Sequence, residues 1–238
     1  DDLFKLTEGK HILRIVPYKY DKDWPFTELL FDYQVGKDQR TYLSPQSYGR
    51  PDPIQEMGEA LRRESKDGWK KARKFLPKFR TYVPVIVRGE EDKGVRFWSF
   101  GKMVFDQILK IAEDTEADGL PSIDDPIGGT DLKIEYISAE DAGQQYPKTV
   151  VLASRKTSKL STSKKELKSF LEDQKKVDDI FDEPSYDDLE EILENWLSGG
   201  GSDDDEDGKK KKSIKSRRSM KSKKSKSKKS KSKKKDDD

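Results

Sequence analysis

Residues 78–102 constrain the fold of this chain most strongly, because they read as two strands joined by a short charged turn. Side chains alternate between the two faces of a strand. One face of the first strand is apolar and carries Phe79, Thr81, Val83, Val85 and Val87. Its other face mixes cations with rings and carries Lys78, Arg80, Tyr82, Pro84, Ile86 and Arg88. In the second strand, Arg96, Trp98 and Phe100 oppose Val95, Phe97 and Ser99.

The mixed face of this hairpin allows two interpretations. Bases stack on aromatic rings and phosphates pair with Lys and Arg, so the face suits single-stranded nucleic acid. The alternative is an ordinary hairpin whose cations are solvated and whose rings lie along apolar surface with their polar ends in water. The hairpin alone does not separate the two.

Other segments show the period-two alternation of half-buried strands. They are residues 10–19, 24–35, 131–138 and 146–155, with a short additional strand at 41–44. Residues 102–113 carry apolar side chains at helical spacing between the earlier and later strands. This order predicts a mainly β (α+β) fold, namely an OB-fold barrel of five or six strands in Greek-key order within residues 1–160.

A loop and helix subdomain, residues 41–77, is predicted to be inserted in the barrel. Residues 45–53 are rich in Pro and Gly, as loops are, and residues 54–64 have helical spacing. Residues 62–78 form the densest basic and aromatic stretch of the folded part, around Trp69 and Phe75. They are either a solvated amphipathic linker or a basic flap beside the hairpin.

Residues 161–197 are predicted to form a C-terminal helical segment. Ser163 with Glu166, and Ser185 with Asp188, have the spacing of helix N-terminal caps. The second helix carries a wide apolar stripe from Leu189 onward, so we expect it to pack on the barrel or on a partner.

Charge is distributed unevenly along the chain. Residues 198–238 contain 17 basic and 8 acidic residues, whereas residues 1–197 contain 32 and 39. A nucleic-acid site on the folded part must therefore be a local basic patch. Residues 198–238 hold almost no apolar side chain and are predicted to be a disordered tail, acidic and then basic. The tail either keeps the protein soluble or binds polyanions without specificity, and its acidic cluster could compete for a basic groove.

The composition argues against several functions. The chain has no Cys and one His, which removes thiol nucleophiles, disulfides, Cys-based zinc sites and most His-centred catalysis. It has no run of about 18 apolar residues, so no membrane span is expected. The acidic runs lie in turns and at a helix start and show no nuclease pattern. We therefore predict no enzyme, with a metal-dependent nuclease as a distant rival.

Four segments in succession resemble a known family: GKHILRIVP (9–17), PFTELLFDY (25–33), RTYVPVIV (80–87) and VRFWSFGKMVFDQI (95–108). The chain resembles the single-stranded DNA-binding, helix-destabilising protein of T-even-type bacteriophages and their marine relatives. The match spans residues 3–156 and, more loosely, 185–197. The resemblance implies an OB-fold core that coats single-stranded DNA cooperatively during replication, recombination and repair. It implies no catalysis and a location in the cytoplasm of the infected bacterial host.

The resemblance also implies a cleft lined by rings and cations from the strands and from the flap. We predict the following DNA-binding residues: Arg14, Tyr42, Tyr48, Trp69, Lys70, Lys71, Arg73, Lys74, Lys78, Arg80, Tyr82, Arg96, Trp98 and Lys102.

This chain departs from the family in two places, the zinc site and the tail. Many members carry a Cys/His zinc site where this chain has residues 42–53, so we predict no zinc, no other cofactor and a subdomain held by packing. The family's acidic tail is replaced by an acidic cluster followed by a basic run. The family's basic N-terminal arm is not visible before Asp1, and residues 154–158 (SRKTS) resemble the short mix of Lys/Arg and Ser/Thr found in that arm.

The expected partners are single-stranded DNA, further copies of the chain along the DNA, and phage replication and recombination proteins reached through the tail. Two rivals stay open: an RNA-binding OB module, and a scaffold that binds proteins and no nucleic acid.

Overall fold

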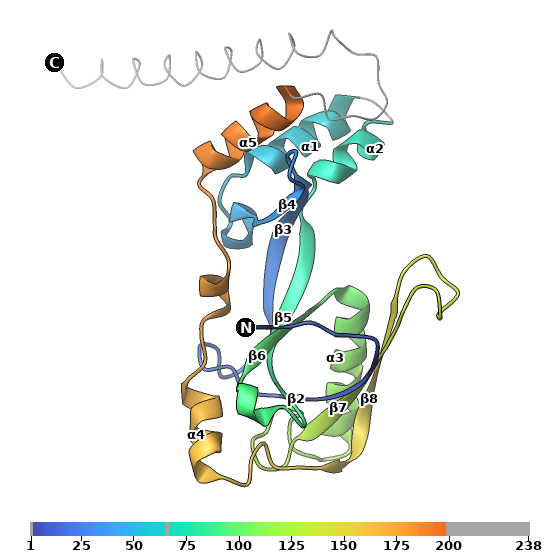
Figure 1. Cartoon of the computed structure of the whole chain (residues 1–238), viewed down its shortest axis with the longest axis vertical. Coiled ribbons are helices and arrows are strands. Elements are labelled where there is room, and N and C mark those ends of the chain that lie inside the picture. The colour runs from blue at the N-terminus through green and yellow to red at the C-terminus, as the bar shows by residue number, and fades with distance from the viewer. Residues whose placement is uncertain (1, 65–66, 199–238) are drawn as a thin grey trace, which may run out of the picture. The chain divides into compact units, whose positions relative to one another are not determined.

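The computed structural model describes residues 2–64 and 67–198, and this part has an α+β fold on one eight-stranded sheet (Figure 1). The strands are β1 (Leu3–Phe4), β2 (Gly9–Ile15), β3 (Thr27–Val35), β4 (Arg40–Leu43), β5 (Lys78–Val87), β6 (Arg96–Phe100), β7 (Thr130–Ile137) and β8 (Lys148–Thr157). The helices are α1 (Pro53–Glu64), α2 (Gly68–Ala72), α3 (Lys102–Ala117), α4 (Lys164–Glu172) and α5 (Tyr186–Ser198). Short 3-10 helices are η1 (Pro45–Tyr48), η2 (Arg73–Phe75), η3 (Glu91–Lys93) and η4 (Val177–Ile180).

The mainly β class predicted from the sequence is confirmed, with more strands than the five or six expected. One additional strand, β1, is two residues long and too short to show an alternating pattern. The sheet order is β1-β6-β5-β2-β7-β8, and β3 leaves this path to pair with β4 and β5.

Strand β5 is the centre of the sheet. One of its edges pairs with β6, while the other pairs with β3 along residues 78–82 and with β2 along residues 85–87. Pro84 lies between these two ladders, and its carbonyl accepts a hydrogen bond from the Val16 amide at 3.0 Å. The nitrogen of Pro84 faces the same edge as its carbonyl, so the missing N–H falls in the gap between β3 and β2.

Both faces of β6, and of β5 from Thr81 onward, are covered. The main core lies on one face, and its members include Leu13, Val83, Trp98, Phe100 and Ile108 of α3. The outer cluster lies on the other face and consists of Tyr18, Leu29, Phe31, Leu43, Tyr82, Phe97 and Val177. The prediction of one buried and one open hairpin face is therefore wrong over most of the hairpin, because the outer cluster covers the face opposite the main core.

The C-terminal helices pack on different parts of the sheet and subdomain. Helix α4 packs through Phe170 with Val16 and Ile86. Helix α5 packs through Leu189 and Leu193 with α1 and Val35 of β3. Its apolar stripe therefore packs mainly on the inserted subdomain and also reaches the sheet at Val35, in part as expected. The short α1 and α2 have too little apolar surface of their own to form a core.

The predicted helix caps are confirmed. The Ser163 hydroxyl accepts a hydrogen bond from the Glu166 amide at 3.3 Å. Ser185 and Asp188 form a reciprocal pair at the start of α5, with amide-to-side-chain distances of 3.1 and 3.2 Å. The predicted tail lies outside the described residues apart from Ser198, which ends α5.

Candidate nucleic-acid interface

Trp98 and Arg96, two predicted contact residues of β6, lie in the interior. The Trp98 side chain is 1% exposed and packs against Phe100 with 4.6 Å between ring centroids. Arg96 is also buried. Its guanidinium donates to Glu90 at 2.6 Å and lies 5.1 Å from the ring centroid of Phe4. A base cannot stack on a ring that is 1% exposed, and the Arg96 guanidinium is paired with Glu90, so the structure does not support the predicted stacking or phosphate contacts of these two residues.

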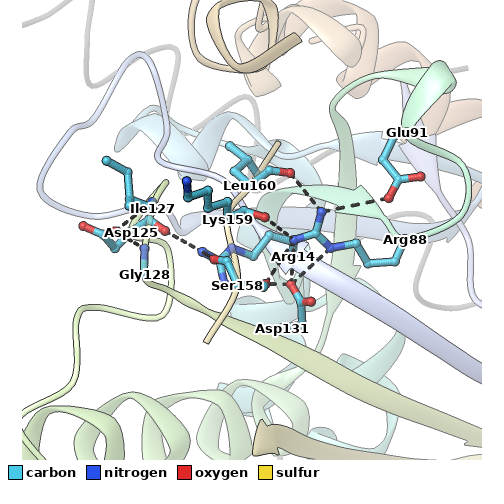
Figure 2. A network of polar contacts seen from close by, with 10 residues as sticks. All are labelled: Arg14, Arg88, Glu91, Asp125, Ile127, Gly128, Asp131, Ser158, Lys159 and Leu160. Atoms are coloured by element: carbon cyan, nitrogen blue, oxygen red, sulfur yellow. Dashed lines mark hydrogen bonds and ion pairs between the residues drawn. The ribbon is translucent and has the colours of Figure 1, made fainter. Parts of the chain in front are cut away.

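Arg14 is buried in a polar network (Figure 2). Its guanidinium donates to the carbonyls of Asp125 and Ser158, and it lies 3.8 Å from the Asp131 carboxylate. Arg88 approaches the same carboxylate at 3.0 Å. Burial lowers the pKa of Arg14 and Asp131 opposes this change. The network fixes the chain before β7 and after β8 to β2, so Arg14 is structural and its assignment to DNA was wrong.

Tyr82 is the fourth predicted residue found in the interior, with 6% of its surface exposed. Its ring centroid lies 5.9 Å from that of Phe31 and 5.2 Å from that of Phe181, which lies between η4 and α5. Burial raises the pKa of the Tyr82 phenol above its ordinary value. The sequence could not reveal the Phe181 contact, because the two rings are almost a hundred positions apart.

Lys78 and Arg80 lie, as the alternation predicted, on the same face of β5. Both approach Tyr33 of β3: the Lys78 amine lies 5.2 Å from the Tyr33 ring centroid, and Arg80 Nε donates to the Tyr33 hydroxyl at 3.2 Å. We call Tyr33, Lys78 and Arg80 the open track. It brings two cations and one ring together on neighbouring strands.

A groove of about 270 Å³ adjoins the open track at Arg80. We call it the β6 groove. It is lined by Phe4, Lys5, Leu6, Arg80, Trp98, Ser99, Phe100, Gly101, Val104, Tyr136 and Thr149. Its two cations are Arg80 and the exposed Lys5. Sequence reasoning missed Lys5 and Tyr136, because the groove forms only when β1 pairs with β6 in parallel and β7 lies nearby.

The basic flap presents one exposed ring. Trp69 of α2 is 52% exposed, and the Lys70 amine lies 6.0 Å from its centroid. Lys74 lies between two rings, 5.2 Å from Phe75 and 5.5 Å from Trp196 of α5. The two remaining predicted cations of the flap are Lys71 and Arg73, in the same short segment.

Three other predicted residues lie apart from the open track. Tyr42 is half-buried against the core shared by α1 and α5. Tyr48 lies 5.1 Å from the Arg50 guanidinium, and burial together with Asp178 raises the pKa of its phenol. Lys102 is exposed, with its amine 2.9 Å from Asp106.

Phe79 is an exposed ring that the sequence placed on the apolar face. It is 46% exposed, although its face of β5 is buried from Thr81 onward. At this end β5 pairs only with β3, and Phe79 lies opposite Leu30, beyond the ladder with β6. Its ring is therefore accessible, on the face of β5 opposite to Lys78.

Comparison with protein-family models identifies residues 7–197 as a gp32 DNA binding protein like domain. The chain belongs to this family of DNA-binding proteins. The resemblance seen in the sequence is confirmed over most of the chain, and the matched range contains the open track, the flap and α5. A comparison with curated proteins found no match.

The residues present do not fit the zinc site common in the family. The chain has no Cys, and within residues 2–64 and 67–198 no cluster of three or more His, Asp or Glu is arranged to hold a metal ion. In the corresponding loop, the Asp52 carboxylate accepts hydrogen bonds from the Ser44 hydroxyl and from the amides of Ile54 and Gln55. Over the same described residues, none of the helices is both long and apolar enough to span a membrane.

Proposed function

We propose that this gp32-like chain binds single-stranded DNA through the open track, the β6 groove and the exposed ring and cations of the flap. The observation that carries the proposal is the placement of Lys78 and Arg80 around Tyr33, next to a groove that contains a further cation. Rings supply stacking surfaces and cations supply phosphate contacts, which together suit a flexible single strand.

The proposed binding has two physical components. Stacking on rings such as Tyr33, Phe79 and Trp69 contributes about 1–3 kcal/mol per base and accepts any base, so sequence preference is weak. Phosphate contacts at Lys78, Arg80 and the flap release counterions, so affinity falls as salt rises. Neither component requires a catalytic group or a metal.

In the cell, this binding would coat single-stranded DNA during phage replication, recombination and repair, in the cytoplasm of the infected bacterium. Further copies along the DNA, and phage replication and recombination proteins reached through residues 198–238, are the proposed protein partners. Membership of a DNA-binding family and the four matching segments support this role. In the absence of cysteines, we propose that packing of α1 against α5 holds the inserted subdomain, with no zinc.

The test follows tryptophan fluorescence while poly(dT) is added at low and at high salt, with duplex DNA and poly(U) as competitors. We expect quenching, mainly from Trp69, that saturates, weakens with salt and is poorly competed by duplex. Equal competition by poly(U) would favour the RNA-binding rival. Absence of binding measured in parallel by anisotropy of labelled oligo(dT) would overturn the proposal.

Variants then locate the interface. Lys78→Ala and Arg80→Ala are each expected to weaken oligo(dT) binding several-fold and to reduce the salt dependence. Lys110→Ala removes an equally basic side chain from α3, where the amine pairs with Asp114 at 3.1 Å. This control is expected to bind as the wild type does. If all three variants behave alike, the proposed position of the interface is wrong.

A further inference from the structure

Residues 142–165 form a run of the chain without an acidic side chain. They contain six basic residues, which are Lys148, Arg155, Lys156, Lys159, Lys164 and Lys165. Residues 1–197 as a whole carry 39 acidic and 32 basic residues, so this run is a local excess of positive charge. Strand β8 makes up its central part and lies at the edge of the sheet.

One face of β8 is covered and the other is open. Val151 lies in the main core with Ile108 of α3. Side chains alternate along a strand, so Lys148 and Leu152 lie on the opposite face, where Leu152 is 59% exposed. Lys133 of β7 lies directly opposite Leu152 and therefore shares this open face.

The acidic side chains of β7 are already paired with cations. Asp131 pairs with Arg14 and Arg88 (Figure 2), and the Glu135 carboxylate lies 3.8 Å from the Lys10 amine. Four exposed cations of β7 and β8 form no ion pair within the part of the chain that the structure describes. We call them the β8 basic face: Lys133, Lys148, Arg155 and Lys156.

This lack of partners distinguishes the β8 basic face from other exposed lysines. Lys102, Lys110 and Lys168 each pair with a carboxylate four residues further along their helix. Over the described residues, the positive charge of the β8 basic face is therefore uncompensated and available to a polyanion.

The open face offers cations without rings. The exposed side chains on either side of Lys133 are aliphatic, namely Ile12 of β2 and Leu152 of β8. Single-strand recognition uses rings as stacking platforms, whereas cations alone can bind the phosphates of a duplex. Strand β8 has 10 residues and so extends about 33 Å, close to one turn of B-form DNA. The β8 basic face therefore suits the backbone of a duplex better than a single strand.

The β8 basic face begins beside the β6 groove. Thr149 lines the groove, and the residue before it, Lys148, is the first residue of β8. If a single strand in the groove continues into a duplex at this end, the first turn of that duplex meets β8.

We propose that the β8 basic face is a second nucleic-acid site, which binds the phosphates of a duplex that adjoins the bound single strand. This inference rests on the function proposed above, in which the β6 groove holds part of the single strand. It predicts that a junction between single-stranded and double-stranded DNA binds more tightly than its single-stranded part alone. The affinity gained at the junction should fall steeply with salt, because it depends on counterion release.

The absence of cysteine in the chain allows the duplex to be located directly. Leu152→Cys carries a photo-crosslinker at the centre of the β8 basic face, and Lys110→Cys carries the same group on an exposed position of α3. The probe is an oligo(dT) tail joined to a short duplex, with the label on the complementary strand, which is present only in the duplex. We expect residue 152 to crosslink to this strand and residue 110 to remain uncrosslinked. Equal crosslinking from both positions, or none from residue 152 when the junction is fully bound, would overturn the inference.

Charge variants test the contribution of the face to affinity. Lys148→Gln with Lys156→Gln is expected to bind the junction several-fold more weakly, with a shallower salt dependence, and to bind the oligo(dT) tail as the wild type does. The control, Lys110→Gln with Lys168→Gln, makes the same change in net charge on α3 and α4 and is expected to bind both probes as the wild type does. Equal weakening in both pairs would mean a general charge effect and would overturn the inference.

The remaining outcomes separate this inference from the proposed function. If wild-type protein binds no oligo(dT), the proposed function fails. If it binds oligo(dT) and the duplex adds no affinity, only the β8 site fails. Equal weakening of junction and tail by Lys148→Gln with Lys156→Gln would make β8 a continuation of the single-strand path, and the assignment to a duplex would be wrong. Unchanged binding of both probes would leave the face to an acidic protein partner and would also overturn the inference.

Discussion

At the scale of single residues, burial decides which predicted side chains can meet a ligand and which instead set stability. Asp32 of β3 is 2% exposed and lies beside Asp52, which is also buried. Burial, followed by repulsion from Asp52, raises the pKa of Asp32 to about 8. Two adjacent buried carboxyl groups are most stable when they share one proton, since both cannot be charged without a large cost.

This carboxyl pair predicts a pH-dependent stability. The folded pKa of Asp32 lies above the unfolded value, so its contribution is complete below pH 4 and declines as pH rises to about 8. The free energy of unfolding is expected to fall by at most about 1.4 kcal/mol per pH unit across this window. Urea unfolding between pH 5 and pH 9 measures it. In Asp32→Asn, the side-chain amide can donate to the Asp52 carboxylate and does not titrate. If the free energy of unfolding of this variant falls with pH as steeply as that of the wild type, Asp32 is not the group that titrates.

Two tryptophans are predicted to respond in opposite ways. Trp69→Ala removes an exposed ring and is expected to weaken oligo(dT) binding by about 1–3 kcal/mol with little change in unfolding temperature. Trp98→Phe alters a buried ring and is expected to lower stability while oligo(dT) affinity stays unchanged. Anisotropy titrations and thermal unfolding of both variants test the pair. Loss of affinity in Trp98→Phe at a temperature where it is fully folded would return this residue to the interface.

At the scale of elements, the outer edge of a strand needs hydrogen-bond partners that its own sequence does not supply. Strand β8 ends the order of the sheet, and its outer edge meets Gln107 of α3. The Gln107 side chain accepts from the Val151 amide at 3.0 Å and donates to the Thr149 carbonyl at 3.2 Å. One glutamine thus makes two hydrogen bonds that a neighbouring strand would make, which protects an exposed edge from other pairings.

Replacing this side chain should open the edge. Gln107→Ala is expected to lower the free energy of unfolding by about 1–3 kcal/mol, because a buried amide and a carbonyl lose their partners. Hydrogen exchange at the Val151 amide is expected to become faster, while exchange in β5 stays slow. Lys110→Ala, one turn further along α3, is the control. Unchanged exchange at Val151 would show that the Gln107 contacts do not close the edge.

At the scale of the whole molecule, residues 1–197 carry a net negative charge, whereas the proposed interface is basic. Residues 1–197 carry more acidic than basic residues, so the open track, the β6 groove and the flap must act as local basic surfaces. The basic run in residues 209–235 is the largest concentration of positive charge in the sequence. Its effect on binding is therefore expected to be long-ranged and sensitive to salt.

Deletion of residues 199–238 tests the contribution of this run. If the basic run contacts DNA, the slope of log affinity against log salt should become shallower in the deletion variant. This variant makes fewer phosphate contacts, so its binding releases fewer counterions. Binding at high salt should change less, since ring stacking is not screened. Oligo(dT) titrations at several salt concentrations give the slope, with tryptophan fluorescence confirming that the remaining chain is folded. An unaltered slope would show that the basic run does not contribute.

The sequence by itself determined the mainly β class, the family, the helix caps and the basic-aromatic character of residues 62–82. These properties depend on local periodicity and residue type, which a chain carries before it folds. Lys78 and Arg80 could be assigned because alternation alone places them on one face of β5.

Only the tertiary structure decided which parts of that face are open. Trp98 is buried because its face of β6 packs in the main core with Phe100 and with Ile108 of α3, and Tyr82 is buried because Phe181 reaches it from a distant segment. Phe79 is exposed because β5 extends beyond the strands that would cover it. Exposure depends on contacts between segments far apart in sequence, and period-two alternation carries no information about those contacts.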